Sequence, residues 1–338
     1  MRQLLPLKGL NDIELCYNEE LLKDKLEECK NALLNSAGLI LDQDTVLLDS
    51  FHSATIEGAR TTVENVKKSL ENPKNKSDRM VVNNMKALER IYSGSCISEG
   101  NLREFWELIV DGVCENEHLK GEQYRNGEVF VSSYDRIVHT PAQHDKIADY
   151  IASLFEFLKI SEEDAIIKAV AFHFYFVYIH PYCDGNGRTA RILQNYCLFT
   201  AGYEGIKRIR ISQAINLHLG AYYKAMELAE KPIVKNQKLM LDLTVFFEYM
   251  LDRIVEACKM AEQKQYSLSE REKLLLKRMS KRGIGAEITV ANASDLMDMS
   301  ERGARNVLNR LCEKRYLMKG KVEGKHKNLY RLIQLIAD

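Results

Sequence analysis

The stretch EEDAIIKAVAFHFYFVYIHPYCDGNGRTARILQNYCLFTA, residues 162–201, decides the fold. After its first turn, Glu162–Ile179 is apolar on nearly all faces, which is typical of a helix buried in the centre of a protein. Pro181 and the glycines after it predict that this helix ends at Ile179 and that the chain then turns tightly. An apolar stripe at helical spacing predicts a second helix over Thr189–Ala201.

The turn Asp184–Gly187 has the chemistry of a phosphate site. A glycine-rich turn that enters a helix offers unpaired backbone N–H groups and the positive end of the helix dipole. Arg188 and Arg191 lie three residues apart, so both can reach one polyphosphate. The Asp184 carboxylate suits a Mg²⁺ ion that bridges phosphate oxygens. His180 lies just before the turn, and an imidazole with an ordinary pKa of about 6.5 suits a general base.

This turn has neither the Gly-Lys-Ser/Thr ending of a Walker A loop nor the preceding strand of a dinucleotide-binding fingerprint. Residues 180–191, HPYCDGNGRTAR, instead resemble the signature of the Fic family, HPFxxGNGRxxR. They depart from its fixed positions only at Tyr182, where phenylalanine is usual. The resemblance extends from about Phe51 to Tyr223.

Two further segments are similar to elements of that family. GEQYRNGEVFVSSYDRIVHTPAQ, residues 121–143, has the Asn-Gly turn pair and β-branched residues of a hairpin. It looks like the flap with which Fic enzymes hold the backbone of their target, and Val129, Phe130 and Val131 are its expected docking residues. SATIEG, Ser53–Gly58, resembles the inhibitory motif (S/T)xxxE(G/N) of the subclass whose inhibitory helix precedes the signature.

The resemblance implies a protein adenylyltransferase that moves AMP from ATP to a Ser, Thr or Tyr hydroxyl of a target protein, or of the chain itself. It implies ATP as substrate, Mg²⁺ as metal and this set of roles: His180 as base; Asp184 on Mg²⁺; Gly185, Asn186 and Gly187 as anion nest, with Asn186 near the α-phosphate; Arg188 on the β- and γ-phosphates; Arg191 on the γ-phosphate. Glu57, with Ser53 and Gly58 in the same motif, is expected to form a bidentate pair with Arg191 and so to inhibit the enzyme.

The predicted fold is mainly α: a Fic-type helical bundle with a small β-hairpin flap, followed by a C-terminal winged helix-turn-helix domain. Thr61–Glu64 matches a capping box that would begin a helix. The expected divisions are a helical N-terminal region over residues 1–110, the catalytic core over 111–230, a connecting helix over 231–264 and the winged-helix domain over 265–338. Further helices are expected near residues 46–55, 62–70, 78–92, 142–158, 212–230 and 239–264.

The last segment is basic, with 16 Lys and Arg against 9 Asp and Glu from residue 265 onward. Three helices followed by two short apolar runs outline a winged helix. Two sets of residues would then meet DNA: Arg302, Arg305, Asn306 and Arg310 on the recognition helix, and Lys319, Lys321, Lys325 and Lys327 on the wing. A solvated face used for dimerisation or for docking a protein is the alternative.

The composition of the chain narrows the classes of function that remain possible. The net charge of the 338 residues is zero, which excludes a chain that binds nucleic acid or membranes by overall charge. The eight cysteines include no C-x-x-C pair, and no apolar run approaches the ~20 residues of a membrane span. We therefore expect a cytoplasmic protein, with a homodimer left open. The competing functions are a winged-helix transcription regulator and a Fic enzyme that transfers UMP, phosphocholine or phosphate, or removes AMP.

Overall fold

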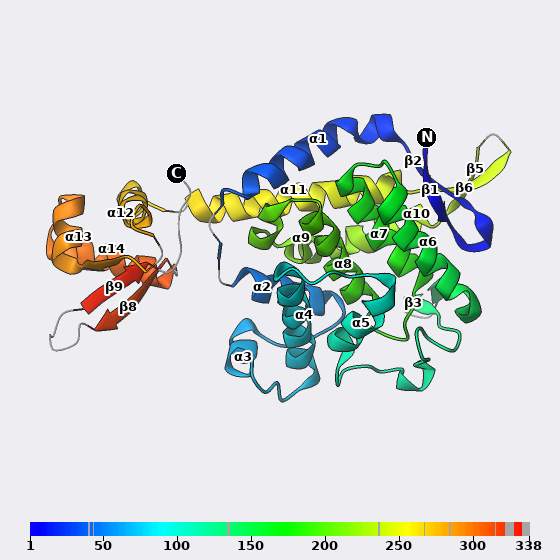
Figure 1. Cartoon of the computed structure of the whole chain (residues 1–338), viewed down its shortest axis with the longest axis horizontal. Helices are drawn as coiled ribbons and strands as arrows, with labels where there is room; N and C mark the ends of the chain where they lie inside the picture. Colours follow the sequence, from blue (N-terminus) through cyan, green and yellow to red (C-terminus); the bar gives the residue numbers. More distant parts are fainter. Residues whose placement is uncertain are drawn as a thin grey trace.

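A computed structural model describes the chain except for residues 40, 43, 134–135, 236, 267, 284, 315, 322–327 and 333–338. Most described residues are helical, as predicted (Figure 1). The helices of the larger body are α1 (Glu19–Ser36), α2 (Thr45–Ile56), α3 (Val63–Lys68), α4 (Lys76–Tyr92), α5 (Leu102–Val110), α6 (Ile147–Ile160), α7 (Ala165–Ile179), α8 (Asn186–Thr200), α9 (Ile211–Leu217), α10 (Leu219–Ala229) and α11 (Thr244–Tyr266).

The predicted central helix is α7, and it organises this body. Asp164 caps it by accepting from the Ile166 N–H at 2.8 Å, and the helix ends at Ile179 as expected. Its aromatic side chains are buried on opposite faces, among them Phe172, Phe174 and Phe176. Helix α8 packs along α7, and one hydrophobic core links both to α4, α5, α6 and α11. This packing fixes the turn between α7 and α8 at the junction of several helices.

Several predictions of local structure were wrong. Residues 232–242 do not begin a helix, because β5 (Pro232–Lys235) and β6 (Lys238–Asp242) form a hairpin there and α11 begins only at Thr244. The N-cap of α3 is Thr62 and not Thr61, since the Thr62 hydroxyl accepts from the Asn65 N–H at 3.2 Å. The helix predicted over 212–230 is divided into α9 and α10 at His218.

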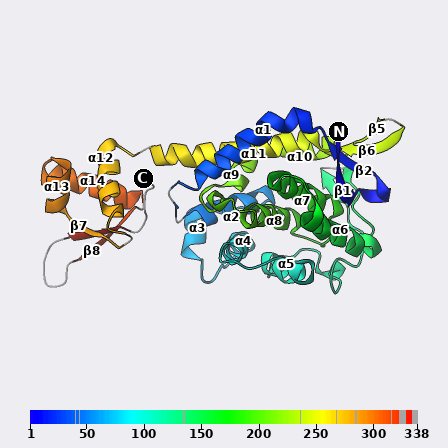
Figure 2. The same cartoon turned by 45° about the horizontal axis from the view of Figure 1, so that its top comes forward.

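The β-structure of the larger body was mostly unforeseen. Strands β1 (Arg2–Lys8) and β2 (Glu14–Tyr17) pair with each other, and β2 lies parallel to β6, giving the sheet order β1-β2-β6-β5. Figure 2 shows this sheet at one end of α11, with α1 running beside that helix. The predicted flap is present as β3 (Val131–Ser133) and β4 (Arg136–His139). Short 3-10 helices complete this body: η1 (Leu10–Asp12), η2 (Glu99–Asn101), η3 (Glu117–Leu119), η4 (His144–Lys146) and η5 (Glu204–Arg208).

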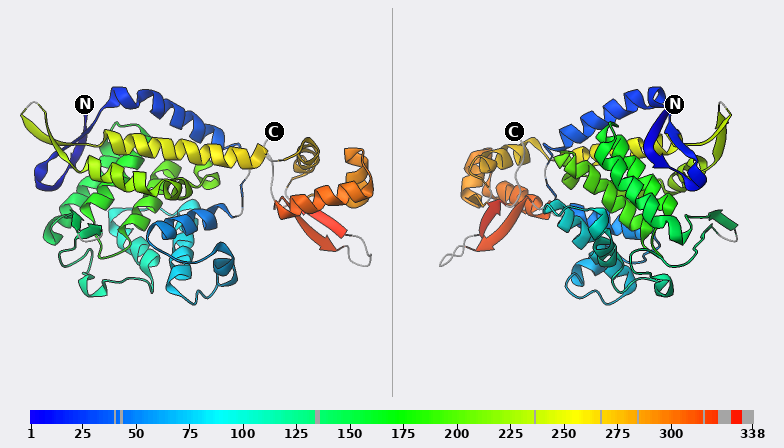
Figure 3. Two further views of the ribbon diagram at one scale, coloured as in Figure 1. Left: turned by 180° about the vertical axis from the view of Figure 1, so that it is seen from behind. Right: turned by 45° about the vertical axis from the view of Figure 1, so that its right-hand side comes forward.

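The C-terminal segment forms a second body with its own core beyond the end of α11 (Figure 3). It contains α12 (Glu270–Ser280), β7 (Glu287–Thr289), α13 (Val290–Met297), α14 (Glu301–Glu313), β8 (Leu317–Lys321) and β9 (Asn328–Leu332), with sheet order β7-β9-β8. The three helices and the final hairpin follow one another in the predicted order, and β7 is additional. That these elements act as a winged helix stays a prediction.

Two sets of residues in this body were assigned to DNA contact. On α14, Arg302, Arg305, Asn306 and Arg310 are all exposed, and Arg310 also pairs with the buried Glu272 carboxylate at 3.2 Å. Lys319 is exposed, the side chain of Lys321 is not described, and Lys325 and Lys327 lie outside the described residues. Across the part of the chain that the structure describes, each helix is too short or too polar to cross a lipid bilayer.

Candidate active site

The turn between α7 and α8 exposes a helix N-terminus. His180 follows α7 in the left-handed region, with φ 54° and ψ 61°. Gly185 is also left-handed, with φ 74°, and a Cβ atom there would lie 2.6 Å from Val110 Cγ1, so glycine is required. Helix α8 begins at Asn186, three residues earlier than predicted, and has no side-chain cap. The first N–H groups of α8 are therefore available to an anion.

Side chains from the turn itself and from α5 hold it rigid. The Asn186 amide donates to the Tyr182 carbonyl at 2.8 Å and accepts from the Tyr182 N–H at 3.0 Å. The Trp106 ring stacks on Tyr182 with centroids 4.4 Å apart, and its Nε1–H donates to the Asp184 carbonyl at 2.7 Å. The Asn186 side chain, which the resemblance placed near the α-phosphate, thus braces the turn.

Tyr182 carries the one departure from the family signature, and its hydroxyl is buried with no hydrogen-bond partner. Tyr182→Phe should remove this desolvated hydroxyl while keeping the stacked ring. We expect the free energy of unfolding to rise by about 1 kcal/mol, measured by urea denaturation. Tyr178→Phe is the matched control, because the Tyr178 hydroxyl accepts from the Leu10 N–H at 3.1 Å and its loss should destabilise the protein. A Tyr182→Phe protein less stable than wild type would contradict this account.

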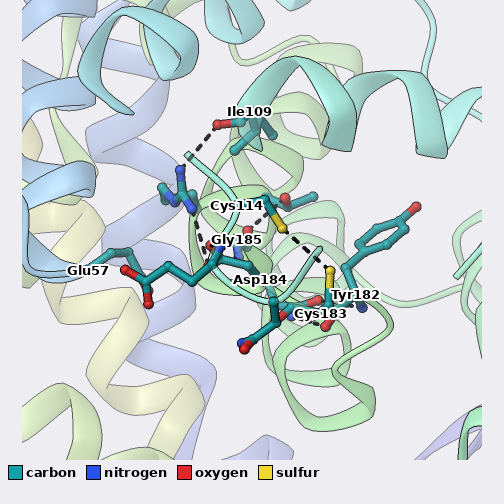
Figure 4. Close-up of polar contacts among 12 residues, drawn as sticks. Glu57, Ile109, Cys114, Tyr182, Cys183, Asp184 and Gly185 are labelled. Atoms are coloured by element: carbon teal, nitrogen blue, oxygen red, sulfur yellow. Dashed lines mark hydrogen bonds and ion pairs between the residues drawn. The ribbon is translucent and has the colours of Figure 1, made fainter. Parts of the chain in front are cut away.

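Asp184, which is labelled in Figure 4, pairs with Arg188 at 3.4 Å. Asp184 accepts from the N–H groups of Gly185 at 2.5 Å and Glu115 at 3.1 Å, and one quarter of its side chain is exposed. Arg188 is buried and donates to the Ile109 carbonyl at 3.1 Å, while its Nε has no partner. Nearby, the sulfur atoms of Cys114 and Cys183 are 3.6 Å apart.

A Mg²⁺ ion fits this donor set only together with a ligand. Among the described residues, no three His, Cys, Asp or Glu side chains converge on one point. Mg²⁺ in nucleotide sites commonly takes one or two carboxylates and completes its shell with phosphate oxygens and water. Asp184 supplies one such carboxylate beside the start of α8.

His180 is held as the tautomer that a base needs. Its Nδ1 lies 3.2 Å from the Val177 carbonyl, which can only accept, so Nδ1 carries the proton and Nε2 carries the lone pair. Burial, with smaller contributions from His139 and Arg125, lowers the pKa of His180 to about 4. The imidazole is therefore neutral at pH 7 and able to accept a proton.

The predicted inhibitory residue reaches this site from α2. Glu57 Oε1 accepts from Arg191 Nη2 at 2.8 Å, and a Cβ atom on Gly187 would collide with the same oxygen. The carboxylate therefore lies against the first turn of α8, where an anion would bind. Burial alone would raise the pKa of Glu57, but the Arg191 guanidinium outweighs it and lowers that pKa.

The predicted bidentate geometry is not observed, because one hydrogen bond joins Glu57 to Arg191. The rest of the guanidinium is directed to Ser53: Nε donates to the Ser53 hydroxyl at 2.9 Å and Nη2 to its carbonyl at 3.0 Å. Arg191 Nη1 is buried without a partner. Gly58 follows with φ 85° and ends the helix.

Helix α2 is anchored by a buried carboxylate. Asp49 accepts from the Ser212 N–H at 2.7 Å and from the Ser212 hydroxyl at 2.9 Å, joining α2 to α9. Burial raises the pKa of Asp49 although both donors act in the opposite direction. The Tyr223 hydroxyl also donates to the Ile56 carbonyl at 3.3 Å, at the end of α2. Glu57 is thus held in place by contacts outside its own motif.

A cavity of about 600 Å³ connects these groups. Its lining includes Glu57, His180 and Gly187 from the predicted site and Val131 from the flap. Of the other two expected flap residues, Phe130 is 57% exposed and Val129 does not line the cavity. No sequence pattern predicted the remaining wall, which is formed by Val177, by His139 of β4 and by Gly220, Tyr222, Tyr223, Lys224, Met226, Glu227 and Glu230 of α10 and its end.

Sequence alone offered little signal for that wall. Tyr222 looks like a core residue at helical spacing, and it is buried, with its hydroxyl 2.9 Å from His173 Nε2. His173 in turn contacts Gln194 Oε1 at 2.6 Å through Nδ1, and burial lowers the pKa of His173 to about 3. This neutral histidine lies inside the core and not in the cavity lining.

Comparison with known proteins gives a consistent result. Residues 97–198 match the model of the Fic/DOC family. A protein adenylyltransferase Fic from Nematostella vectensis is 25% identical over 203 residues, covering 55% of this chain and 46% of that protein. One from Drosophila virilis is 27% identical over 194 residues, covering 53% of this chain and 39% of that protein. The chain thus spans less than half the length of these curated relatives.

Solved structures extend the likeness in fold. A Fic family protein from Desulfovibrio desulfuricans G20 superposes with a TM-score of 0.60 at 22% identity, covering 92% of this chain and 95% of that one. A Fic-domain signalling protein from Bacteroides thetaiotaomicron superposes with a TM-score of 0.54 at 18% identity, covering 73% and 97%. At these identities the likeness establishes the helical fold.

Proposed function

Residues 97–198 form a Fic/DOC-family domain, and we propose that this domain transfers AMP from ATP to a hydroxyl group of a protein. The observation that carries the proposal is the meeting of three features in one cavity. These are the neutral His180 imidazole, the uncapped first turn of α8 around Gly187 and the flap residue Val131. A base, an anion seat and a surface for a target chain are the parts that such a transfer needs.

The polyphosphate is assigned to the first turn of α8. Its free N–H groups and dipole favour negative charge, and the buried guanidinium groups of Arg188 and Arg191 lie on the same helix. Arg188 Nε and Arg191 Nη1 are buried donors without partners, as expected of groups reserved for a ligand. A bound Mg²⁺ would rest on Asp184 and neutralise charge on the phosphates.

The nucleoside is assigned to the α10 side of the cavity, where Tyr222, Tyr223 and Met226 offer apolar and aromatic surface. The target hydroxyl would enter beside Val131. His180 Nε2 takes its proton, the hydroxyl oxygen forms a bond to the α-phosphorus, and the bond to the leaving pyrophosphate breaks. The products are an AMP-modified protein and pyrophosphate.

Glu57 supplies the proposed autoinhibition. Its carboxylate occupies the space above Gly187 and pairs with the arginine assigned to the γ-phosphate. A triphosphate in the productive position would meet a like charge and would lose Arg191 as a partner. The same site could take UTP, so the base that it selects is part of the test.

The test compares the fate of two labels. Purified protein, wild type and Glu57→Gly, is incubated with Mg²⁺ and ATP labelled at either the α- or the γ-phosphate. Label from the α-position alone should remain on the protein, and intact-mass analysis should show the addition of one AMP per modified site. Retention of the γ-label would indicate phosphate transfer instead, and stronger modification by UTP than by ATP would indicate UMP transfer.

A further inference from the structure

Arg125 is a buried arginine that takes no part in the proposed chemical steps. It precedes the flap, and its side chain is fully buried. Its nearest carboxylate, Glu128, is 3.9 Å away and half-exposed, so the pairing is weak. A buried guanidinium is costly unless its donors are satisfied. The hydrogen-bond partners of the Arg125 guanidinium therefore indicate what this residue does in the fold.

Those partners are backbone carbonyls in three separate segments. Arg125 Nε donates to the His180 carbonyl at 2.9 Å. Nη1 donates to the Gly127 carbonyl at 2.6 Å, and Nη2 donates to the Ala142 carbonyl. The backbone N–H of Arg125 also donates to the Pro181 carbonyl at 3.0 Å.

This pattern joins the catalytic turn to both ends of the flap. Gly127 precedes β3 and Ala142 follows β4, while His180 and Pro181 form the start of the turn. The planar fork of an arginine fixes the directions of its donors, so one side chain sets the relative positions of all three segments.

Arg125 contacts His180 at a point where the backbone conformation is unfavourable. A histidine at φ 54° lies in the left-handed region, which is unfavourable for residues other than glycine and persists only where the surroundings enforce it. Two hydrogen bonds from Arg125 hold the carbonyls of His180 and of the residue after it. They fix the direction in which the imidazole leaves the backbone.

We propose that Arg125 is a positioning residue that holds the His180 base and the two ends of the target-binding flap in register. The inference rests on the proposed AMP transfer. A target chain docked on the flap would present its hydroxyl at a defined distance from His180 Nε2 only while both are fixed to the same group. The hydrogen bonds and ion pair of Arg125 do not include Asp184, Arg188 or Arg191. Its loss should therefore affect the reaction step and leave ATP binding unchanged.

A second effect of Arg125 is electrostatic. Its positive charge, like burial and His139, holds the pKa of His180 down, while Glu57 acts in the opposite direction. His180 thus faces Arg125 ahead of the flap, His139 on β4 and Glu57 after α2; Lys224, Glu227 and Glu230 of the α10 wall share its cavity. Loss of the Arg125 charge alone should raise the pKa of His180.

Two variants in a Glu57→Gly background separate geometry from charge. Arg125→Lys keeps the charge but loses the fork, and Arg125→Gln loses both. Arg253→Lys is the matched control, because Arg253 is a largely buried arginine of α11 that pairs with Glu256 outside the cavity lining. Each protein is assayed for self-modification by labelled ATP against ATP concentration and pH, and for hydrogen exchange of the flap amides.

In Arg125→Lys we expect the maximal rate to fall about tenfold or more, with the half-saturating ATP concentration changed less than about twofold. In the profile of rate against pH, the acid limb of Arg125→Lys should stay in place because the charge is kept. The acid limb of Arg125→Gln should move to higher pH, because the pKa of His180 rises and the base must be unprotonated to act. The flap amides should exchange faster in both Arg125 variants. Arg253→Lys should match the Glu57→Gly parent in rate and in amide exchange.

Three results would overturn the inference: an unchanged maximal rate in Arg125→Lys, a rise in half-saturating ATP that accounts for the whole loss, or flap exchange equal to the parent. If the Glu57→Gly parent transfers no AMP, the proposed function fails instead. Hydrogen exchange at the two ends of the flap then still decides whether Arg125 fixes them. Thermal melting identifies a variant that fails to fold, and the other substitution then carries the test.

Discussion

Glu57→Gly is expected to raise self-modification by ATP about 100-fold. The substitution removes the carboxylate that lies over Gly187 and frees Arg191 Nη2 for the γ-phosphate. Opposed like charges cost several kcal/mol, and each 1.4 kcal/mol corresponds to a tenfold change in rate. The measurement is the initial rate of label transfer from α-labelled ATP at equal protein concentration.

Two controls separate this effect from a general loosening. Glu71→Gly removes an exposed carboxylate that lies outside the motif and outside the cavity lining, and it should leave the rate at the wild-type level. ATP should also raise the melting temperature of Glu57→Gly more than that of wild type, because at a given concentration a ligand that binds more tightly stabilises the folded state more. A Glu57→Gly protein as inactive as wild type would remove the inhibitory role.

His180→Ala in the Glu57→Gly background is expected to lower AMP transfer by about 100- to 10,000-fold, the usual contribution of a positioned base. The lone pair of His180 Nε2 is assigned to the target hydroxyl, and Nδ1 contacts the Val177 carbonyl at 3.2 Å. The proposal therefore gives neither ring nitrogen a part in binding ATP. ATP affinity, measured by calorimetry, should therefore change little.

The exposed His118, in η3, supplies the matched control: His118→Ala should keep the parent rate. If His180→Ala kept the parent rate as well, another group would have to take the proton, and the cavity lining offers His139 as the next imidazole. A fall in ATP affinity equal to the fall in rate would instead assign His180 to binding.

The helical skeleton was largely predictable because its signals are local. The apolar run of α7, the glycines after it and the spacing of Arg188 and Arg191 are each contained within a few turns of chain. The same holds for the motif Ser53–Gly58. Local signals were misleading where one apolar pattern suits two structures, as at residues 232–242, whose strands exist because β6 pairs with β2.

The sequence by itself determined the long apolar helix, the glycine turn, the charges at the start of the next helix and the signature motif of residues 180–191, because backbone preference and residue spacing act over short distances. Tertiary structure alone decided which distant groups meet. It placed Glu57 over Gly187, assigned Ser53 as a further partner of Arg191, joined Arg125 to His180 and set Tyr222 in the cavity wall. Such meetings depend on how whole helices pack, and periodicity carries no information about that register.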